Sequence, residues 1–489
     1  MKKISVNKFA ISTFFCLISF LNITKADVSL PAIISNNMVL QQKIDANLWG
    51  WAKPDEQIEI TPSWNNVTVR IRADKEGKWI AKVKTDKAGG PYIITFKGKN
   101  TIVLKDVYLG EVWFCSGQSN MEMKVSSSND ADSISKAATN PLIRMFTVKR
   151  ATSLIPQEDV IGNWVVNSPS SVGNFSAVAY HYGNELASRL NIAIGLIHSS
   201  WGGTPAESWV SKDVLESDES FKPILNRYKQ QIKKYETGDL NEAEKKIGDP
   251  RKYYKSPFLL YNAMLAPLLK YRIKGVIWYQ GEANASRAYQ YRKLFPSLIR
   301  SWRDEFKIGA LPFYYVQIAP FRGLNPEIRE TQFIALQTLD FVGMAVTSDI
   351  GECEDIHPKN KQDVGKRLSY IALNKNYGFK DIEYLSPMYS RYEIENNKIR
   401  VFFDTESKLL AKGGVLREFV IAGEDRVFHP AIAKVEGKTV VVYSENVEKP
   451  ISVRFGWKNC PDMNLFNEAG LPASPFRTDT WKGITEGKY

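Results

Sequence analysis

The first part of the chain, residues 27–105, alternates hydrophobic and polar residues in short runs. Clear examples lie at residues 67–71 and 92–96, and Gly, Asn, Asp and Pro separate the runs. Alternation with a period of two is typical of half-buried β-strands, and these separating residues are typical of turns. This part therefore predicts a small antiparallel β-sandwich. The same pattern returns in residues 386–489, which predict a second β-rich module.

Between these two parts, residues 106–385 alternate apolar strands with helical patterns. Such alternation predicts βαβ units, and therefore an α/β fold with a parallel sheet covered by helices on both faces. The expected strands are 111–115, 192–198, 275–279, 313–318 and 343–347. The expected helices are 176–190, 257–270, 288–306, 328–341 and 361–375. A lysine- and glutamate-rich stretch at about 213–256 interrupts this domain and predicts a solvated helical insertion.

The N-terminus has the pattern of a secretory signal peptide. Lys2, Lys3 and Lys8 precede an apolar stretch, residues 9–21, and Thr24-Lys25-Ala26 supplies small residues for cleavage. This stretch is short for a membrane span, although an uncleaved anchor is the alternative. We therefore expect residues 1–26 to be removed and the protein to be exported, either to a periplasm or as a secreted protein. No later segment is apolar and long enough to predict a membrane span.

Charge and cysteine content exclude several functions. Residues 1–26 carry four lysines and no acid, so the formal net charge falls from +12 to +8 on cleavage. That modest excess is spread along the chain; it could favour anionic sugars but forms no stripe of the kind that binds nucleic acid. Cys115, Cys353 and Cys460 are too few and too scattered for a disulfide framework. No metal-binding or phosphate-binding motif is present, so we expect neither a metal nor a cofactor.

Polar sequence follows four of the five expected strands at the point where each strand ends. The carboxyl ends of parallel strands share one edge of an open sheet, and ligands bind there. We therefore expect these segments to converge although they are far apart in the sequence. They are 117–120, 199–204, 280–284 and 348–358.

Ser119 is the candidate nucleophile at this edge. Gly117 permits a sharp bend after the strand, and the following residues can direct backbone N–H groups at a developing oxyanion. A serine nucleophile needs a general base. Among the four histidines, His357 is the best base, because it lies in a strand-end loop beside carboxylates.

The other histidines are expected to be structural, because His181 lies in an apolar helical pattern, His198 in an apolar strand and His429 in the C-terminal module. A catalytic imidazole benefits from a carboxylate that fixes its tautomer. We assign this role to Asp355, and Glu354 or Glu282 are alternatives.

Acyl transfer also needs hydrogen-bond donors for the oxyanion. The backbone N–H groups of Ser119 and of Gly202 or Gly203 are suitable, as is the side-chain amide of Gln280 or Asn284. The indole of Trp201 is expected to stack on a sugar. The residues expected to contact the substrate are Gln118, Asn120, Trp201, Glu282 and Asn284.

At these residues the chain resembles the sialate O-acetylesterase family, a branch of the SGNH hydrolases with a flavodoxin-like catalytic core. The matching segments are 115–121, 200–204, 278–282 and 355–358, and the resemblance runs from about residue 30 to about 480. It implies that Ser119 is the nucleophile, that His357 is the base, and that Gly202, Gly203 and Gln280 contribute to the oxyanion hole. The wider pattern has an aspartate three residues before the histidine, where this chain has Glu354.

These observations together predict an exported serine esterase that removes O-acetyl groups from carbohydrates through an acetyl-serine intermediate. O-acetylated sialic acids are the expected substrates. An acetyl esterase for xylan or another polysaccharide is the alternative, and a non-catalytic carbohydrate-binding protein is the alternative from another class. A basic pocket residue such as Arg322 or Arg329 would favour sialate, whereas an open groove lined by aromatic residues would favour a polymer.

Overall fold

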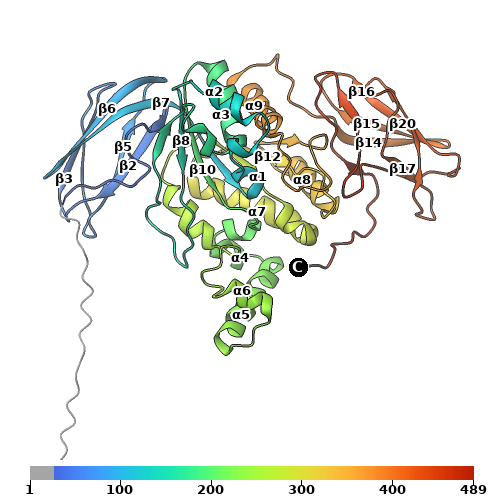
Figure 1. Ribbon diagram of the computed structural model, residues 1–489, viewed down its shortest axis with the longest axis horizontal. Helices are drawn as coiled ribbons and strands as arrows, with labels where there is room; N and C mark the ends of the chain where they lie inside the picture. Colours follow the sequence, from blue (N-terminus) through green and yellow to red (C-terminus); the bar gives the residue numbers. More distant parts are fainter. Residues whose placement is uncertain (1–26) are drawn as a thin grey trace, which may run out of the picture.

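The computed structural model describes residues 27–489, so the expected signal peptide lies outside the described residues. An α/β core occupies the middle of the molecule, with one β-rich module at each end (Figure 1). The expected fold class, an α/β core with a parallel sheet flanked by β-rich modules, is confirmed.

The core sheet has the strand order β13-β12-β11-β7-β10-β8-β9, and all neighbouring pairs are parallel except β8 with β9. Counted along the chain, β7, β10, β11, β12 and β13 give the order 2-1-3-4-5 of flavodoxin-like folds. Each of these five matches an expected strand, and β8 and β9 extend the sheet beyond them. The bounds are β7 (Thr101–Gly117), β8 (Ile143–Thr147), β9 (Trp164–Val166), β10 (Ala193–Ser200), β11 (Gly275–Tyr279), β12 (Phe313–Gln317) and β13 (Val342–Val346).

Helices cover both faces of this sheet. Neighbouring side chains of a strand point to opposite sides, so buried residues of β7 contact helices on each face. Trp113 packs against Tyr182 of helix α3, with ring centroids 5.2 Å apart. Phe114 packs against Trp302 of helix α7 at 5.7 Å. Helix α9 packs beside α3, and α8 packs beside α7. The bounds are α3 (Ala177–Leu190), α7 (Ala288–Phe306), α8 (Glu327–Thr338) and α9 (Lys361–Tyr377).

The helix expected at 257–270 is not a regular α-helix. A π-helical turn, Tyr261–Leu265, leads into a 3-10 turn, Ala266–Leu268. Pro267 lies inside the expected helix, and proline has no N–H to donate and crowds the preceding turn. The segment is nevertheless buried, which explains its apolar pattern.

The N-terminal module shares a strand with the core. Residues 101–109 of β7 pair antiparallel with β6, whereas residues 110–117 pair parallel with β10. The boundary expected at residue 105 therefore falls inside one continuous strand. The other strands of the module are β1 (Val39–Gln41), β2 (Asp45–Trp51), β3 (Gln57–Pro62), β4 (Val69–Arg72), β5 (Lys78–Lys84) and β6 (Gly89–Lys97).

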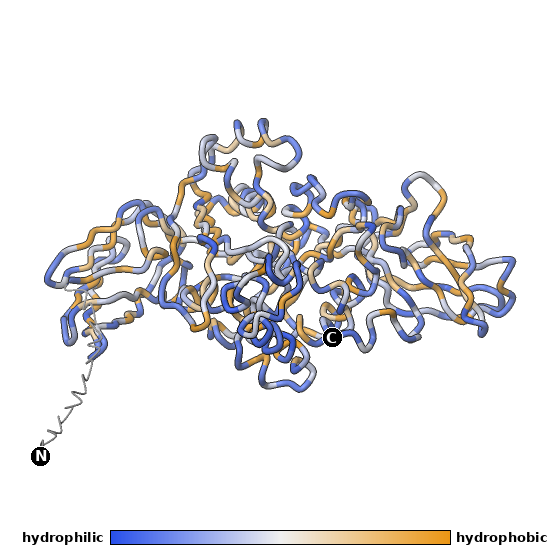
Figure 2. Tube along the Cα trace, turned by 60° about the horizontal axis from the view of Figure 1, so that its bottom comes forward, coloured by the Kyte–Doolittle hydropathy of each residue, from blue (hydrophilic) through white to orange (hydrophobic). Residues whose placement is uncertain are grey.

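The C-terminal module has its own hydrophobic core, and hydrophobic residues alternate with hydrophilic ones along the outer modules (Figure 2). One four-stranded sheet contains β14 (Met388–Glu395), β15 (Lys398–Asp404), β20 (Thr439–Tyr443) and β19 (Ile432–Glu436). A second contains β18 (His429–Pro430), β17 (Phe419–Ala422), β21 (Ser452–Phe455) and β23 (Phe476–Arg477). The small pair is β16 (Leu409–Ala411) with β22 (Leu465–Asn467).

The lysine-rich insertion is helical, as the sequence predicts. Its helices α4 (Lys212–Glu216), α5 (Lys222–Thr237) and α6 (Glu242–Ile247) project from the core at the bottom of Figure 1. No helix within residues 27–489 combines the length and the apolar character needed to cross a membrane.

Candidate active site

Ser119 lies at a sharp turn between β7 and the short helix α1 (Ser119–Glu122). Gly117 has φ of +142°. A Cβ atom at Gly117 would lie 2.1 Å from the carbonyl oxygen of Tyr279 in β11, so only glycine fits here. The N–H of Gln118 donates to the same carbonyl at 3.0 Å. The neighbouring strand therefore fixes the turn that presents Ser119 at the carboxyl end of the sheet.

His357 reaches Ser119 from the loop between β13 and α9. Its Nε2 lies 2.8 Å from Oγ of Ser119, although the two residues are 238 positions apart. Burial and the charge of Lys361 lower the pKa of His357, while Asp355 opposes this shift. The imidazole is therefore neutral at neutral pH and can accept the serine proton.

The three candidate acids have different surroundings. Oδ1 of Asp355 lies 3.6 Å from Nδ1 of His357 and accepts the backbone N–H of His357 at 2.8 Å. Glu354 is exposed and pairs with Arg322. Glu282 is buried and accepts a hydrogen bond from Asn120 at 2.6 Å. Of the three, Asp355 is the carboxylate that contacts the far side of the imidazole.

Asn120 connects the turn at Ser119 with the loop that carries His357. Its side-chain amide donates to Glu282 and, at 2.9 Å, to the carbonyl oxygen of Ile356. Its side-chain oxygen accepts from the ammonium of Lys361 at 2.5 Å. Burial lowers the pKa of Lys361 to about 7 and raises the pKa of Glu282. The role of Lys361 is not predictable from the sequence, because a lysine at the start of a helical pattern resembles a surface residue.

The two glycines expected to donate to an oxyanion differ. The N–H of Gly202 donates to the carboxylate of Glu122 at 2.8 Å. The N–H groups of Gly203 and Ser119 have no hydrogen-bond acceptor in residues 27–489. These two groups are therefore free to bind an oxyanion, whereas the N–H of Gly202 is occupied.

Gln280 and Asn284 form a buried network behind the site. Nε2 of Gln280 donates to Oδ1 of Asn284 at 2.7 Å, and Oε1 of Gln280 accepts from Tyr291 at 2.8 Å. The amide of Asn284 donates to Glu207 at 2.9 Å. Because these amides are bonded within the protein, they support the loop after β11 and do not offer the expected donors to the cavity.

Ser119 and His357 open onto a cavity of about 560 Å³. Of the five residues expected to contact the substrate, Gln118 and Glu282 line this cavity, whereas Asn120, Trp201 and Asn284 do not. The indole of Trp201 stacks on the ring of Tyr254 with centroids 4.7 Å apart. The lining residues are Gln118, Ser119, Gly202, Gly203, Pro205, Lys255, Glu282, Ala283, Arg287, Ile356 and His357.

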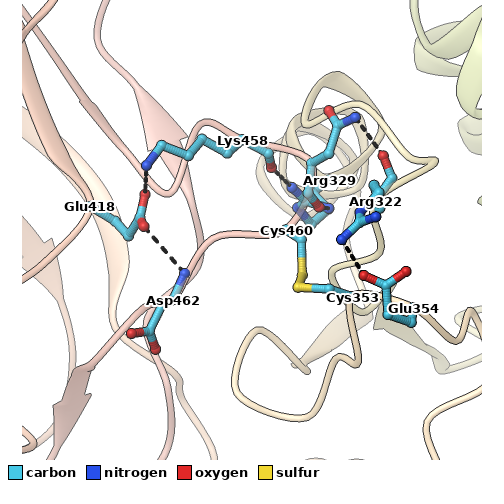
Figure 3. The surroundings of a disulfide bond; sticks show 9 residues. Arg322, Arg329, Cys353, Glu354, Glu418, Lys458, Cys460 and Asp462 are labelled. Atoms are coloured by element: carbon cyan, nitrogen blue, oxygen red, sulfur yellow. Dashed lines mark hydrogen bonds and ion pairs between the residues drawn. A yellow bond between two sulfur atoms is a disulfide. The ribbon is translucent and has the colours of Figure 1, made fainter.

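A disulfide bond joins the loop of His357 to the C-terminal module (Figure 3). Cys353 is bonded to Cys460, 107 residues later, while Cys115 is free and buried in β7. The sequence leaves open whether the scattered cysteines pair; two of them do, although a single bond forms no disulfide framework. Their spacing gives no indication of this, because only packing of the C-terminal module on the core brings them together.

The two arginines expected to mark a sialate pocket lie outside the cavity and beside this disulfide (Figure 3). The backbone N–H of Arg322 donates to the carbonyl of Cys353 at 3.1 Å, and its carbonyl oxygen accepts from Nδ2 of Asn459 in the C-terminal module at 2.7 Å. Arg329 is buried and donates to the carbonyl oxygens of Lys458 and, at 3.4 Å, of Asn459. Both arginines thus connect the core to the C-terminal module.

Within the described part of the chain, no group of three or more His, Cys, Asp or Glu side chains is arranged to hold a metal ion.

Comparison with known proteins gives a consistent result. The family model described as "Carbohydrate esterase, sialic acid-specific acetylesterase" matches residues 109–241 and 248–373. The sialate O-acetylesterase of Mus musculus is 29% identical over 91% of this chain and 93% of its own length. That of Rattus norvegicus is 30% identical over 92% and 94%. The crystal structure of a carbohydrate acetylesterase from Xanthomonas citri is 35% identical, covers 93% of this chain and 100% of that one, and has a TM-score of 0.83.

Proposed function

Because the chain belongs to the carbohydrate esterase family of sialic acid-specific acetylesterases, we propose that it removes O-acetyl groups from sialic acids through an acetyl-enzyme on Ser119. The observation that carries this proposal is the 2.8 Å contact between Nε2 of His357 and Oγ of Ser119 at a cavity. The intact contact also argues against a carbohydrate-binding protein without activity.

In the first half of the reaction, His357 takes the proton of Ser119 while Oγ attacks the acetyl carbonyl carbon. The N–H groups of Ser119 and Gly203 stabilise the oxyanion, and Asp355 stabilises the imidazolium. His357 then gives its proton to the sugar oxygen as the ester bond breaks. In the second half, His357 activates a water molecule that attacks the acetyl-enzyme and releases acetate and free Ser119.

The test is acetate release from O-acetylated N-acetylneuraminic acid by the wild type and by Ser119→Ala. Loss of the nucleophile should lower kcat by about 10⁴- to 10⁶-fold. Ser127→Ala is the matched control, because Ser127 is exposed and lies a few residues further along the chain. A Ser119→Ala protein that keeps the wild-type rate contradicts the proposal.

A polysaccharide acetyl esterase is the second candidate, because the stacked Trp201–Tyr254 pair directly precedes two residues that line the cavity, Gly202 and Lys255. Acetylated xylan, assayed in parallel with acetylated sialic acid, separates the two functions. A higher kcat/KM on acetylated xylan would identify the polysaccharide as the preferred substrate. The proposed mechanism would remain the same.

We also propose that the protein is exported after cleavage behind Ala26. The basic and apolar pattern of residues 1–26 supports this, and so does the Cys353–Cys460 bond, since disulfides persist in oxidising compartments. N-terminal sequencing of the native protein should begin at Asp27. A mature protein that begins at Met1 would contradict cleavage.

A further inference from the structure

Lys255 brings a positive charge to the cavity from the end of the helical insertion. It lines the cavity together with Ser119 and His357. A Cβ atom built on Gly203 would lie 3.2 Å from Nζ of Lys255, so the ammonium lies directly over this glycine. The N–H of Gly203 is one of the two free donors described above. The positive charge therefore lies beside the reacting groups and comes from a segment outside the core sheet.

The other cations near the cavity already have partners. Arg287 pairs with the buried Glu207 at 2.6 Å, and Arg150 pairs with Glu122. Lys361 is buried and bonded to Asn120. Lys255, in contrast, forms no ion pair with any carboxylate in residues 27–489, and its ammonium lies 5.6 Å from the ring centroid of Tyr254. It is thus the cavity-lining cation whose charge remains available to a ligand.

The surroundings of Lys255 are held in place from the core side. Tyr254 stacks on Trp201 with an angle of 10° between the rings, and the guanidinium of Arg150 lies 5.5 Å from the Trp201 ring. Glu122 binds this guanidinium and also accepts the N–H of Gly202. The aromatic wall beside Lys255 is therefore connected to α1, the helix that begins at Ser119.

We infer that Lys255 forms a carboxylate subsite that binds the C1 carboxylate of the acetylated sugar. This inference rests on the proposed function and names the group of the substrate that is recognised. Sialic acids carry an ionised carboxylate at neutral pH, and an unpaired ammonium in a cavity binds such a group through charge-assisted hydrogen bonds. Acetylated xylose units have no carboxylate, so they would gain nothing from Lys255.

The experiment compares two substrates that differ only in charge. They are O-acetylated N-acetylneuraminic acid and its neutral C1 carboxamide, both assayed by acetate release. In Lys255→Met, the ratio of kcat/KM for the acid to kcat/KM for the carboxamide should fall about 10- to 100-fold, mainly through KM. Lys252→Met is the matched control, because Lys252 is exposed in the same segment and does not line the cavity. It should keep the wild-type ratio.

Three other outcomes would contradict the inference, each for a different reason. An equal loss on both substrates in Lys255→Met would assign the ammonium to oxyanion stabilisation or to local structure. An unchanged ratio with no loss would show that Lys255 does not contact the substrate. If the wild type releases acetate from neither substrate but does so from acetylated xylan, the proposed sialate specificity fails, and the inference fails with it.

Discussion

Asp355 contacts His357 twice, because one carboxylate oxygen lies 3.6 Å from Nδ1 of the imidazole and 2.8 Å from the backbone N of the same residue. This oxygen therefore restrains both the loop and the ring. Glu354, the adjacent residue, pairs with Arg322 instead. The arrangement favours Asp355, the expected acid, over Glu354, its neighbouring alternative.

We expect Asp355→Asn to lower kcat by roughly 10²- to 10³-fold, because an amide stabilises the imidazolium poorly and favours the wrong tautomer. This loss is smaller than for a buried triad acid, since half of the Asp355 side chain is exposed to solvent. Glu354→Gln is the matched control and should change kcat by less than about 2-fold, in line with a surface ion pair. Steady-state kinetics of acetate release measures both. A larger loss in Glu354→Gln than in Asp355→Asn would reverse the assignment.

The pH dependence of kcat/KM should depend on the charge of Lys361. His357 must be neutral to accept a proton, and its pKa lies below the usual 6.5, so the midpoint of the acid limb of kcat/KM should lie below pH 6.5. Lys361 contributes to this lowering, and its replacement in Lys361→Met should raise the pKa and move the acid limb to higher pH. Lys359→Met, an exposed neighbour, serves as the control. An acid limb that stays in place in Lys361→Met would show that this charge does not act on His357.

Loss of the Cys353–Cys460 bond should affect both stability and turnover. The bond closes a loop of 107 residues, for which the chain-entropy estimate is about 4 to 5 kcal/mol. The Cys353→Ser/Cys460→Ser variant should therefore unfold at a lower temperature. Since Cys353 lies four residues before His357, kcat/KM should also fall, by up to about 10²-fold if the imidazole is displaced by about 1 Å.

A reductant provides the control for this variant. It should lower the melting temperature and kcat/KM of the wild type toward those of the double variant, while leaving the variant unchanged. A double variant with wild-type kcat/KM would show that the disulfide does not position His357.

Two buried histidines should make the protein sensitive to acid. Burial lowers the pKa of His181 and of His198 to about 4, compared with 6.5 in the unfolded chain. The unfolded state therefore binds protons first as the pH falls, so stability is complete above pH 6.5 and is lost between pH 6.5 and 4. Each imidazole contributes on the order of 3 kcal/mol.

Melting temperatures at pH 7 and pH 4.5 test this expectation. The wild type should lose stability over this interval, and His181→Phe should lose less of it. His429→Phe, on the short edge strand β18, should retain the wild-type pH dependence. Equal losses in His181→Phe and in the wild type would contradict the contribution of this imidazole.

The sequence predicts the core sheet well because its strands are buried on both faces and appear as continuous apolar runs. Strands β8 and β9 were missed, since they are short and β9 contains only three residues. The contact between Ser119 and His357 was predictable from their places at strand ends. Features that depend on tertiary packing were not, including the Cys353–Cys460 pair and the orientation of Asp355 relative to Glu354.

Strand β7 limits where the chain of this esterase can be divided into fragments that fold. Its first half belongs to the antiparallel sheet of the N-terminal module, and its second half ends at Gly117, two residues before Ser119. A recombinant fragment that starts at residue 106 would begin inside the strand that supports the nucleophile and would leave β1 behind, which pairs with the same strand. Because the N-terminal module and the turn at the nucleophile share β7, swapping the module between relatives requires exchanging this strand as well.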